Sequence, residues 1–227
     1  MKNSKEHSAK IDKIIRSLRN FLPKVKPPDV TEPLEALLFG LLCEHRPEKN
    51  ARKIFKNLLS HFADLNDLRV SRAEEILDIF QDHSPEASAT ASTLTRALNR
   101  AFDRYDMLAL APLKDIGKRQ AKKELQDLAP ASPFAVNFCF LTALGGHAIP
   151  INPQMMEFLK SNQLIDPDTS PEQIDTFFER HVSASKAWEF YQLLRYGCEN
   201  PDKIASDGKI PKKTARKTAP SEFKPKK

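Results

Sequence analysis

The feature that most constrains this chain is the spacing of its apolar residues, which follows a helical period over most of the length between Ser8 and Asn200. In the segment 9–22, for example, the apolar side chains recur every three or four positions and fall on one face of a helix. No segment alternates apolar and polar residues as a half-buried strand does, and no hairpin turn separates two apolar runs. The sequence therefore predicts an all-α protein of about ten helices.

Residues typical of helix ends mark several boundaries. A proline-rich joint over 23–30 ends the first helix. Ser71 and Ser170 each stand three residues before a Glu or Gln, in the spacing of a capping box, which predicts that helices begin there. Asn152 precedes a proline, and this pair is favoured at the N-cap and the first position of a helix.

Two apolar segments indicate a helical core. The segment 134–144 fits a strand or a helix by composition, but its length and its position between helical segments favour a buried helix. The segment 31–45 is apolar on most sides after its first turn, which is typical of a central helix. With 227 residues, the chain is long enough for one globular unit or two closely joined lobes.

The sequence carries no sign of membrane insertion or secretion. No apolar run approaches the ~18 residues of a membrane span, and the polar N-terminus lacks the apolar part of a secretory signal. Cys43, Cys139 and Cys198 lie far apart, each in or beside an apolar stretch. They predict reduced thiols in a cytoplasmic (nucleoid-associated) or nuclear protein. Cys139 is either a core residue or a nucleophile.

The positive charge is concentrated in the segment 201–227. This segment holds nine Lys or Arg and three acidic residues, and the difference equals the net charge of +6 of the whole chain. It is poor in apolar residues, so we expect a disordered basic tail. Two interpretations stay open: a solubilising tail, or a tail that binds polyanions such as DNA through its phosphates. The candidate DNA-binding residues in the tail are Lys212, Lys213, Arg216 and Lys217.

The order of elements over 31–198 resembles the helix-hairpin-helix (HhH-GPD) DNA glycosylases of the endonuclease III type. The resemblance begins at EPLEALLFGLLCEHRPEKNARKIFKNLL. It is sharpest over 128–154, where LAPASPFAVNFCFLTALGGHAIPINPQ aligns without a gap to the family's L-P-G-V-G-x-K-T-A, helix, glycine and V-D-T-H pattern. Near the end, LLRYGCENPDK resembles the family's H-G-R-Y-x-C stretch.

This resemblance implies a two-lobed helical fold. Residues 31–146 are expected to form a helical barrel lobe with a hairpin-like element near 128–134. Residues 1–30 are expected to form an N-terminal helix that packs with a C-terminal lobe of residues 147–200. Duplex DNA would lie across the cleft between the lobes.

Several positions depart from the family pattern. Where the family's hairpin glycines bring N–H groups to a DNA phosphate, this chain has Pro130 and Ser132, followed by Pro133. Proline has no N–H to donate, so we expect a weakened phosphate contact. Phe134 stands at the position of the lysine with which bifunctional members form a Schiff base, and it cannot do that chemistry. Asn152 replaces the catalytic aspartate, and it keeps the helix cap but offers neither charge nor base.

The resemblance also addresses cofactors and base recognition. Cys198 matches the first cysteine of the family's iron–sulfur cluster, and no cysteine follows it. Because four thiolates hold a [4Fe–4S] centre, the sequence predicts no cluster and no other metal or cofactor, with Cys198 as a lone remnant. His45 matches the loop position from which a glutamine fills the gap left by a flipped-out base, and Arg46 is placed to meet a phosphate. The alternative is two exposed polar residues after a helix.

Three hypotheses follow for the function. The first is a DNA-binding protein of this base-excision-repair superfamily that lacks the glycosylase and lyase chemistry. Its partners would be duplex DNA, with abasic or distorted duplex as candidates, and a repair protein. The second is a monofunctional glycosylase with a relocated carboxylate, for which Glu44 and Glu157 are the candidates. The third is a protein-interaction scaffold. Whether the chain is an enzyme stays open among them.

Overall fold

The computed structural model describes residues 4–22 and 24–201. The predicted tail from residue 202 on, with Lys212, Lys213, Arg216 and Lys217, lies outside the described residues. The described part forms eleven α-helices and two 3₁₀-helices and contains no strand, so the predicted all-α class is confirmed. None of these helices is long and apolar enough to span a membrane. The elements are α1 (Ser4–Phe21), α2 (Pro33–Cys43), α3 (Glu48–His61), α4 (Leu65–Val70), α5 (Ala73–Phe80), α6 (Pro85–Tyr105), η1 (Ala111–Lys114), α7 (Lys118–Leu128), α8 (Pro133–Thr142), α9 (Pro153–Ser161), α10 (Pro171–His181), η2 (Ala184–Lys186) and α11 (Ala187–Glu199).

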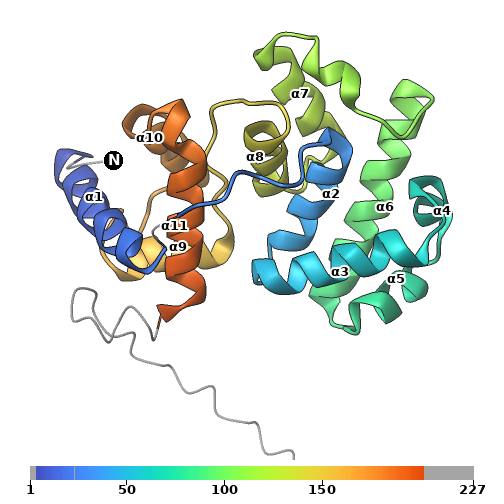
Figure 1. Cartoon of the computed structure of the whole chain (residues 1–227), viewed down its shortest axis with the longest axis horizontal. Coiled ribbons are helices and arrows are strands. Elements are labelled where there is room, and N and C mark those ends of the chain that lie inside the picture. The colour runs from blue at the N-terminus through green and yellow to red at the C-terminus, as the bar shows by residue number, and fades with distance from the viewer. Residues whose placement is uncertain (1–3, 23, 202–227) are drawn as a thin grey trace, which may run out of the picture.

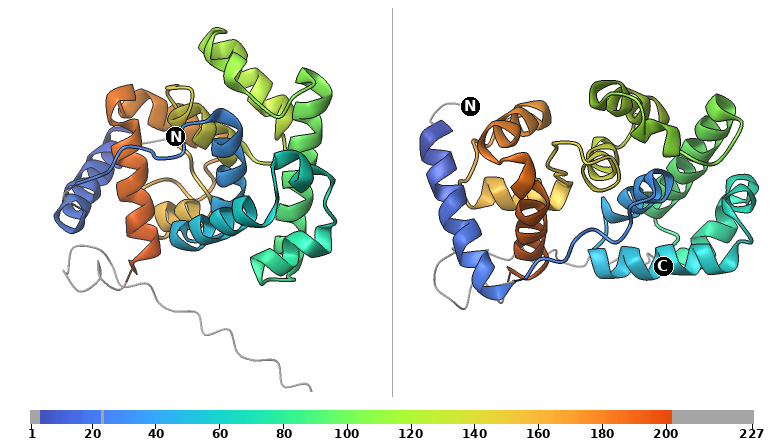
Figure 2. Two further views of the ribbon diagram at one scale, coloured as in Figure 1. Left: turned by 45° about the vertical axis from the view of Figure 1, so that its right-hand side comes forward. Right: turned by 45° about the horizontal axis from the view of Figure 1, so that its top comes forward.

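The helices gather in two lobes. Helices α2 to α8 occupy one side of Figure 1, and α1, α9, α10 and α11 occupy the other. Helix α1 lies beside α11 in both further views and contacts it (Figure 2). The segment 24–32 crosses between the lobes, and the indole Nε1 of Trp188 donates a hydrogen bond to the backbone oxygen of Lys26 at 2.6 Å. This bond ties the connecting segment to α11.

Helix α2 is central to the larger lobe. All of its residues except Glu35 are buried, and it packs along α8. A Cβ atom added at Gly40 would lie 2.9 Å from the Cα atom of Ala135, so only glycine lets the two helices approach this closely. The buried helix predicted over 134–144 is α8, whose residues 134–142 are all buried.

The helix ends confirm two of the predicted caps and correct a third. The side chain of Asn152 caps α9, and Ser170 forms a complete capping box at the start of α10. The capping box predicted at Ser71 is wrong: α5 has no side-chain cap, and the Ser71 hydroxyl donates to the backbone oxygen of Leu68 at 2.8 Å. The reason is α4, a six-residue helix. Asp64 is its N-cap and Ser71 is its C-cap. Six residues are too few to show a helical period in the sequence.

Candidate nucleic-acid interface

Residues 129–132 form the turn between α7 and α8, which we call the hairpin. Ser132 is the N-cap of α8 and accepts a hydrogen bond from the N–H of Ala135 at 3.0 Å. Its hydroxyl donates to the carboxylate of Glu44, and its N–H donates to the backbone oxygen of Ala129 at 3.1 Å. Ser132 is only 1% exposed. The candidate DNA-binding Ser132 thus uses its polar groups inside the protein, where it holds a carboxylate beside the hairpin.

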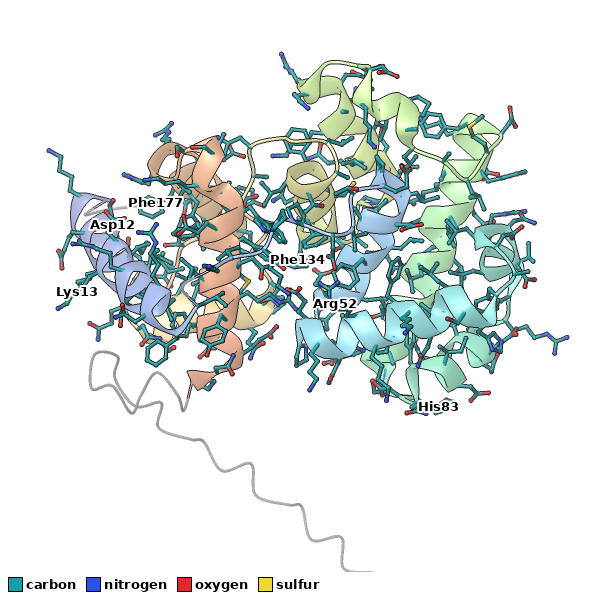
Figure 3. The ribbon with its side chains drawn as sticks, in the orientation of Figure 1. Asp12, Lys13, Arg52, His83, Phe134 and Phe177 are labelled. Atoms are coloured by element: carbon teal, nitrogen blue, oxygen red, sulfur yellow. The ribbon has the colours of Figure 1, made fainter. Side chains whose placement is uncertain are left out.

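Phe134 lies where the two lobes meet (Figure 3), and it is 3% exposed. Its ring centroid is 6.3 Å from the ring of Phe138 and 6.3 Å from the ring of Tyr191. Trp188 extends the group, with its ring centroid 5.5 Å from that of Tyr191. We call Phe134, Phe138, Trp188 and Tyr191 the aromatic cluster. It joins α8 to α11, and it leaves no amine nucleophile at position 134.

Arg195 adjoins this cluster from α11 and joins the lobes by hydrogen bonds. Its Nη1 donates to the phenolic oxygen of Tyr191 at 2.7 Å. Its Nη2 donates to the backbone oxygen of Cys43, the last residue of α2, at 3.2 Å, and to that of Arg46 in the following loop at 2.8 Å. Its Nε donates to the carboxylate of Glu199 at 2.7 Å. The side chain of Arg195 is 3% exposed, so this is a buried charge whose donors are almost all satisfied.

Glu199 completes the junction from the same helix. One oxygen of its carboxylate accepts from both Arg195 and the N–H of Glu48, the latter at 2.9 Å. Glu48 is the first residue of α3, which has no side-chain cap of its own, and a negative charge near a helix N-terminus is favourable. This pair was not among the residues predicted from the sequence. An arginine followed four positions later by a glutamate, near the end of a largely apolar helix, is the signal that indicates it.

His45 and Arg46 follow α2, and their side chains differ in environment. His45 is exposed. The guanidinium of Arg46 lies over the ring of Phe80, 5.0 Å from its centroid, and pairs with the carboxylate of Asp82 at 3.5 Å. Its buried Nη1 has no hydrogen-bond partner within the described residues. At this loop, therefore, His45 projects into solvent and Arg46 packs on α5.

Asn152 is buried, and its Oδ1 accepts from the N–H of Met155 at 2.8 Å. The start of α9 lies against the end of α11, where the Nε2 of Gln154 donates to the backbone oxygen of Cys198 at 3.3 Å. Position 152 thus caps a helix beside the segment that resembles the start of the family's cluster loop. Glu157, the other candidate carboxylate, is exposed on α9.

The thiols of this chain do not fit a four-thiolate cluster. Cys43, Cys139 and Cys198 are all buried, and none of them forms a disulfide. The Cys139 sulfur donates to the backbone oxygen of Pro33 at 3.1 Å, inside the α2–α8 interface. Among the described residues, no group of three His, Cys, Asp or Glu side chains is arranged to hold a metal ion. That the chain works without a cluster stays a prediction.

Comparison with solved structures defines the class of fold. Endonuclease III, trapped as a covalent intermediate with DNA, matches with a TM-score of 0.65 at 14% identity, over 84% of this chain and 85% of that chain. The 8-oxoguanine glycosylase/lyase of Clostridium acetobutylicum, in complex with DNA, matches with a TM-score of 0.64 at 14% identity, over 88% and 71%. A thermostable thymine-DNA glycosylase matches with a TM-score of 0.61 at 13% identity, over 86% of each chain.

The chain therefore has the endonuclease III-like fold of the helix-hairpin-helix DNA glycosylases, as the resemblance predicted. No protein-family model and no curated protein matches its sequence. The likeness thus rests on the arrangement of the helices, at a level of identity where only the fold is shared.

Proposed function

We propose that this chain is a DNA-binding protein that keeps the endonuclease III-like fold and lacks the glycosylase and lyase chemistry. The side chains at two positions, Phe134 and Asn152, cannot perform that chemistry. The observation that carries the proposal is the burial of Phe134 in the aromatic cluster. A phenyl ring has no lone pair with which to attack a sugar carbon, as the lysine of the bifunctional enzymes does. Endonuclease III and the 8-oxoguanine glycosylase/lyase were solved as DNA complexes, which supports duplex DNA as the partner.

The amide of Asn152 supports the same conclusion for the second position. Its oxygen accepts the hydrogen bond that a carboxylate would accept at this N-cap, so the start of α9 keeps its geometry. A neutral amide neither removes a proton from water nor stabilises a developing positive charge on the sugar. The substitution preserves the structural role of the position and removes its chemistry.

In this proposal, DNA contacts come from groups outside the two altered positions. The exposed His45 would reach the duplex from the loop after α2. The basic segment from residue 202 on, with Lys212, Lys213, Arg216 and Lys217, would add phosphate contacts that carry no sequence information. Abasic or distorted duplex is the expected preferred form, and a repair enzyme that completes the chemistry is the expected protein partner.

One observation favours a second candidate function, that of a monofunctional glycosylase. Glu44 lies at the hairpin, where Ser132 donates a hydrogen bond to its carboxylate. A carboxylate held there is a candidate base for activating water. Glu157 is the weaker candidate because it stands exposed on α9, and no hydrogen bond or ion pair with another described residue positions it.

Single-turnover base excision separates these functions. The full chain, in excess over a panel of duplexes that carry damaged, mismatched or abasic sites, is assayed for abasic product and for binding in the same samples. Glu44→Gln and Glu157→Gln are the matched variants, since each exchanges a carboxylate for an amide of nearly equal size.

The expected result is binding, with preference for abasic or mismatched duplex, and no abasic product. A burst of product that Glu44→Gln abolishes and Glu157→Gln leaves intact would overturn the proposal in favour of the monofunctional glycosylase. If the chain neither binds DNA nor forms product, both candidate functions are overturned, and a protein-interaction scaffold is favoured.

A further inference from the structure

The first two turns of α7 carry a dense group of cations. Lys118, Arg119, Lys122 and Lys123 occupy four of the six positions from 118 to 123. Side chains three or four positions apart on a helix are neighbours, so the four cations share one surface. They line a hollow of about 890 Å³ together with Gly117, Gln120, Gln126 and Phe140. We call this the α7 hollow.

Little of this positive charge is neutralised by the protein. Lys122 pairs with Glu179 of α10 at 3.3 Å. Within the described residues, Lys118, Arg119 and Lys123 form no ion pair; Lys118 donates instead to the backbone oxygen of Leu144. The first turn of α7 holds no acidic residue.

The backbone at the start of α7 adds to this polarity. The helix begins after Gly117 with no side-chain cap, and a Cβ atom at Gly117 would meet nothing within 4 Å. The first N–H groups of a helix have no partner within the helix, and the N-terminus carries a partial positive charge. Cations placed at this end repel that partial charge, so an anion in the hollow would relieve the repulsion.

We propose that the α7 hollow binds backbone phosphates of duplex DNA, as a further contact surface besides His45 and the basic segment from residue 202 on. This inference rests on the proposed DNA-binding function. The hollow suits phosphates better than a protein partner, because its one aromatic residue, Phe140, is 5% exposed and offers no apolar anchor. The hollow extends along α7 from Gly117 to Gln126, and the hairpin follows where the same helix ends at Leu128.

The test is the salt dependence of DNA binding by the full chain. A fluorescent 25-bp duplex is titrated by anisotropy over a series of salt concentrations for three proteins. These are the wild type, the hollow variant K118Q/R119Q/K123Q, and the control variant K5Q/K13Q/K24Q, which loses three exposed charges from α1 and the following segment. All six residues are exposed, and circular dichroism melts check that both variants fold.

Each lost phosphate contact lowers the slope of log K against log salt by roughly 0.9. For the hollow variant we expect the magnitude of the slope to fall by about 2 to 3, and the affinity at low salt to fall at least about tenfold. For the control variant we expect each of these two changes to be no more than about a third as large. If the wild type binds and the two variants behave alike, the hollow is not a phosphate site and the proposed function stands. If the wild type binds no DNA, both inferences fail together.

Arg119→Glu alone should weaken binding further than Arg119→Gln, and equal effects would contradict a role for charge.

Discussion

The Nη2 atom of Arg195 donates a hydrogen bond to the backbone oxygen of Arg46 at 2.8 Å, although 149 positions separate the two residues in the chain. The bond joins the last helix to the loop after α2, and with it one lobe to the other. The same side chain reaches Tyr191 of the aromatic cluster. The loop that presents His45 is therefore fixed by a side chain from the opposite lobe.

Arg195→Gln is expected to lower the free energy of unfolding by about 3–5 kcal/mol, because it leaves buried carbonyl oxygens and the Glu199 carboxylate without their charged partner. Urea denaturation at pH 7 measures the change. The matched control is Arg19→Gln, which breaks an exposed pair with Glu189 and should cost about 1 kcal/mol or less. Equal effects of the two substitutions would contradict the role of Arg195 as the interlobe bond.

Phe134→Ala is expected to cost about 3–5 kcal/mol, since it removes a fully buried ring and leaves a cavity in the aromatic cluster. Phe134→Leu fills part of that space and should cost less. Val70→Ala, at a position that is 62% exposed, should change stability by about 0.5 kcal/mol or less. Thermal and urea unfolding of the three variants provide the comparison. A Phe134→Ala protein as stable as the Val70→Ala protein would show that the cluster does not hold the lobes.

Asn152→Ala is expected to lower stability by about 1 kcal/mol, because α9 loses the side-chain oxygen that accepts from Met155. Asn152→Ser should retain most of the stability, as serine is a comparably good N-cap. Denaturation curves of the pair distinguish a cap from a residue kept only for packing. If Asn152 serves only for packing, the Ala and Ser variants should lose similar amounts of stability.

Asp175 of α10 meets Asn137 of α8, whose Nδ2 donates to the Asp175 carboxylate at 3.2 Å. Burial raises the pKa of Asp175 above its ordinary value, and this rise outweighs the opposing effects of Asn137 and Lys122. Nearby Glu179 and Glu172 raise the pKa further.

A carboxyl group with a raised pKa favours the folded state below its unfolded pKa of about 4, and that contribution is lost as the pH rises through the folded pKa. At pH 7 the folded protein therefore carries the cost of a buried charge. Asp175→Asn should raise the urea midpoint at pH 7, and the difference should shrink below about pH 4. A lower midpoint for the variant at pH 7 would contradict this account.

Burial raises the pKa of the Cys43 thiol to about 12, and burial also raises the pKa of Cys139. The Cys43 thiol is therefore almost entirely protonated at pH 8, whereas the thiolate is the reactive form. We expect no alkylation of either residue by iodoacetamide in the folded protein at pH 8, and complete alkylation in 6 M guanidinium, as measured by peptide mass spectrometry. Rapid labelling of folded Cys139 would reopen its interpretation as a nucleophile.

Much of the fold was predictable because its signals are local. Helical period, segment length and capping residues predicted about ten helices, and the caps at Asn152 and Ser170 depend on side-chain contacts to backbone groups only three residues away. Helix α4 was missed, and with it the correct role of Ser71, because a six-residue helix carries too little pattern. For the candidate site residues, the sequence did not show that Ser132 and Arg46 turn their polar groups toward the protein.

The sequence by itself determined most of the helices, the caps at Asn152 and Ser170, and the residue types at positions 134 and 152. Only the tertiary structure decided that Phe134 packs against the ring of Tyr191 from the other lobe, that Arg195 and Glu199 fix the loop after α2, and that the cations of α7 line one hollow. The physical reason is the separation along the chain of the residues that come into contact. Helices and caps form through contacts within about four residues, whereas these arrangements join residues far apart in the chain, whose meeting depends on how whole helices pack.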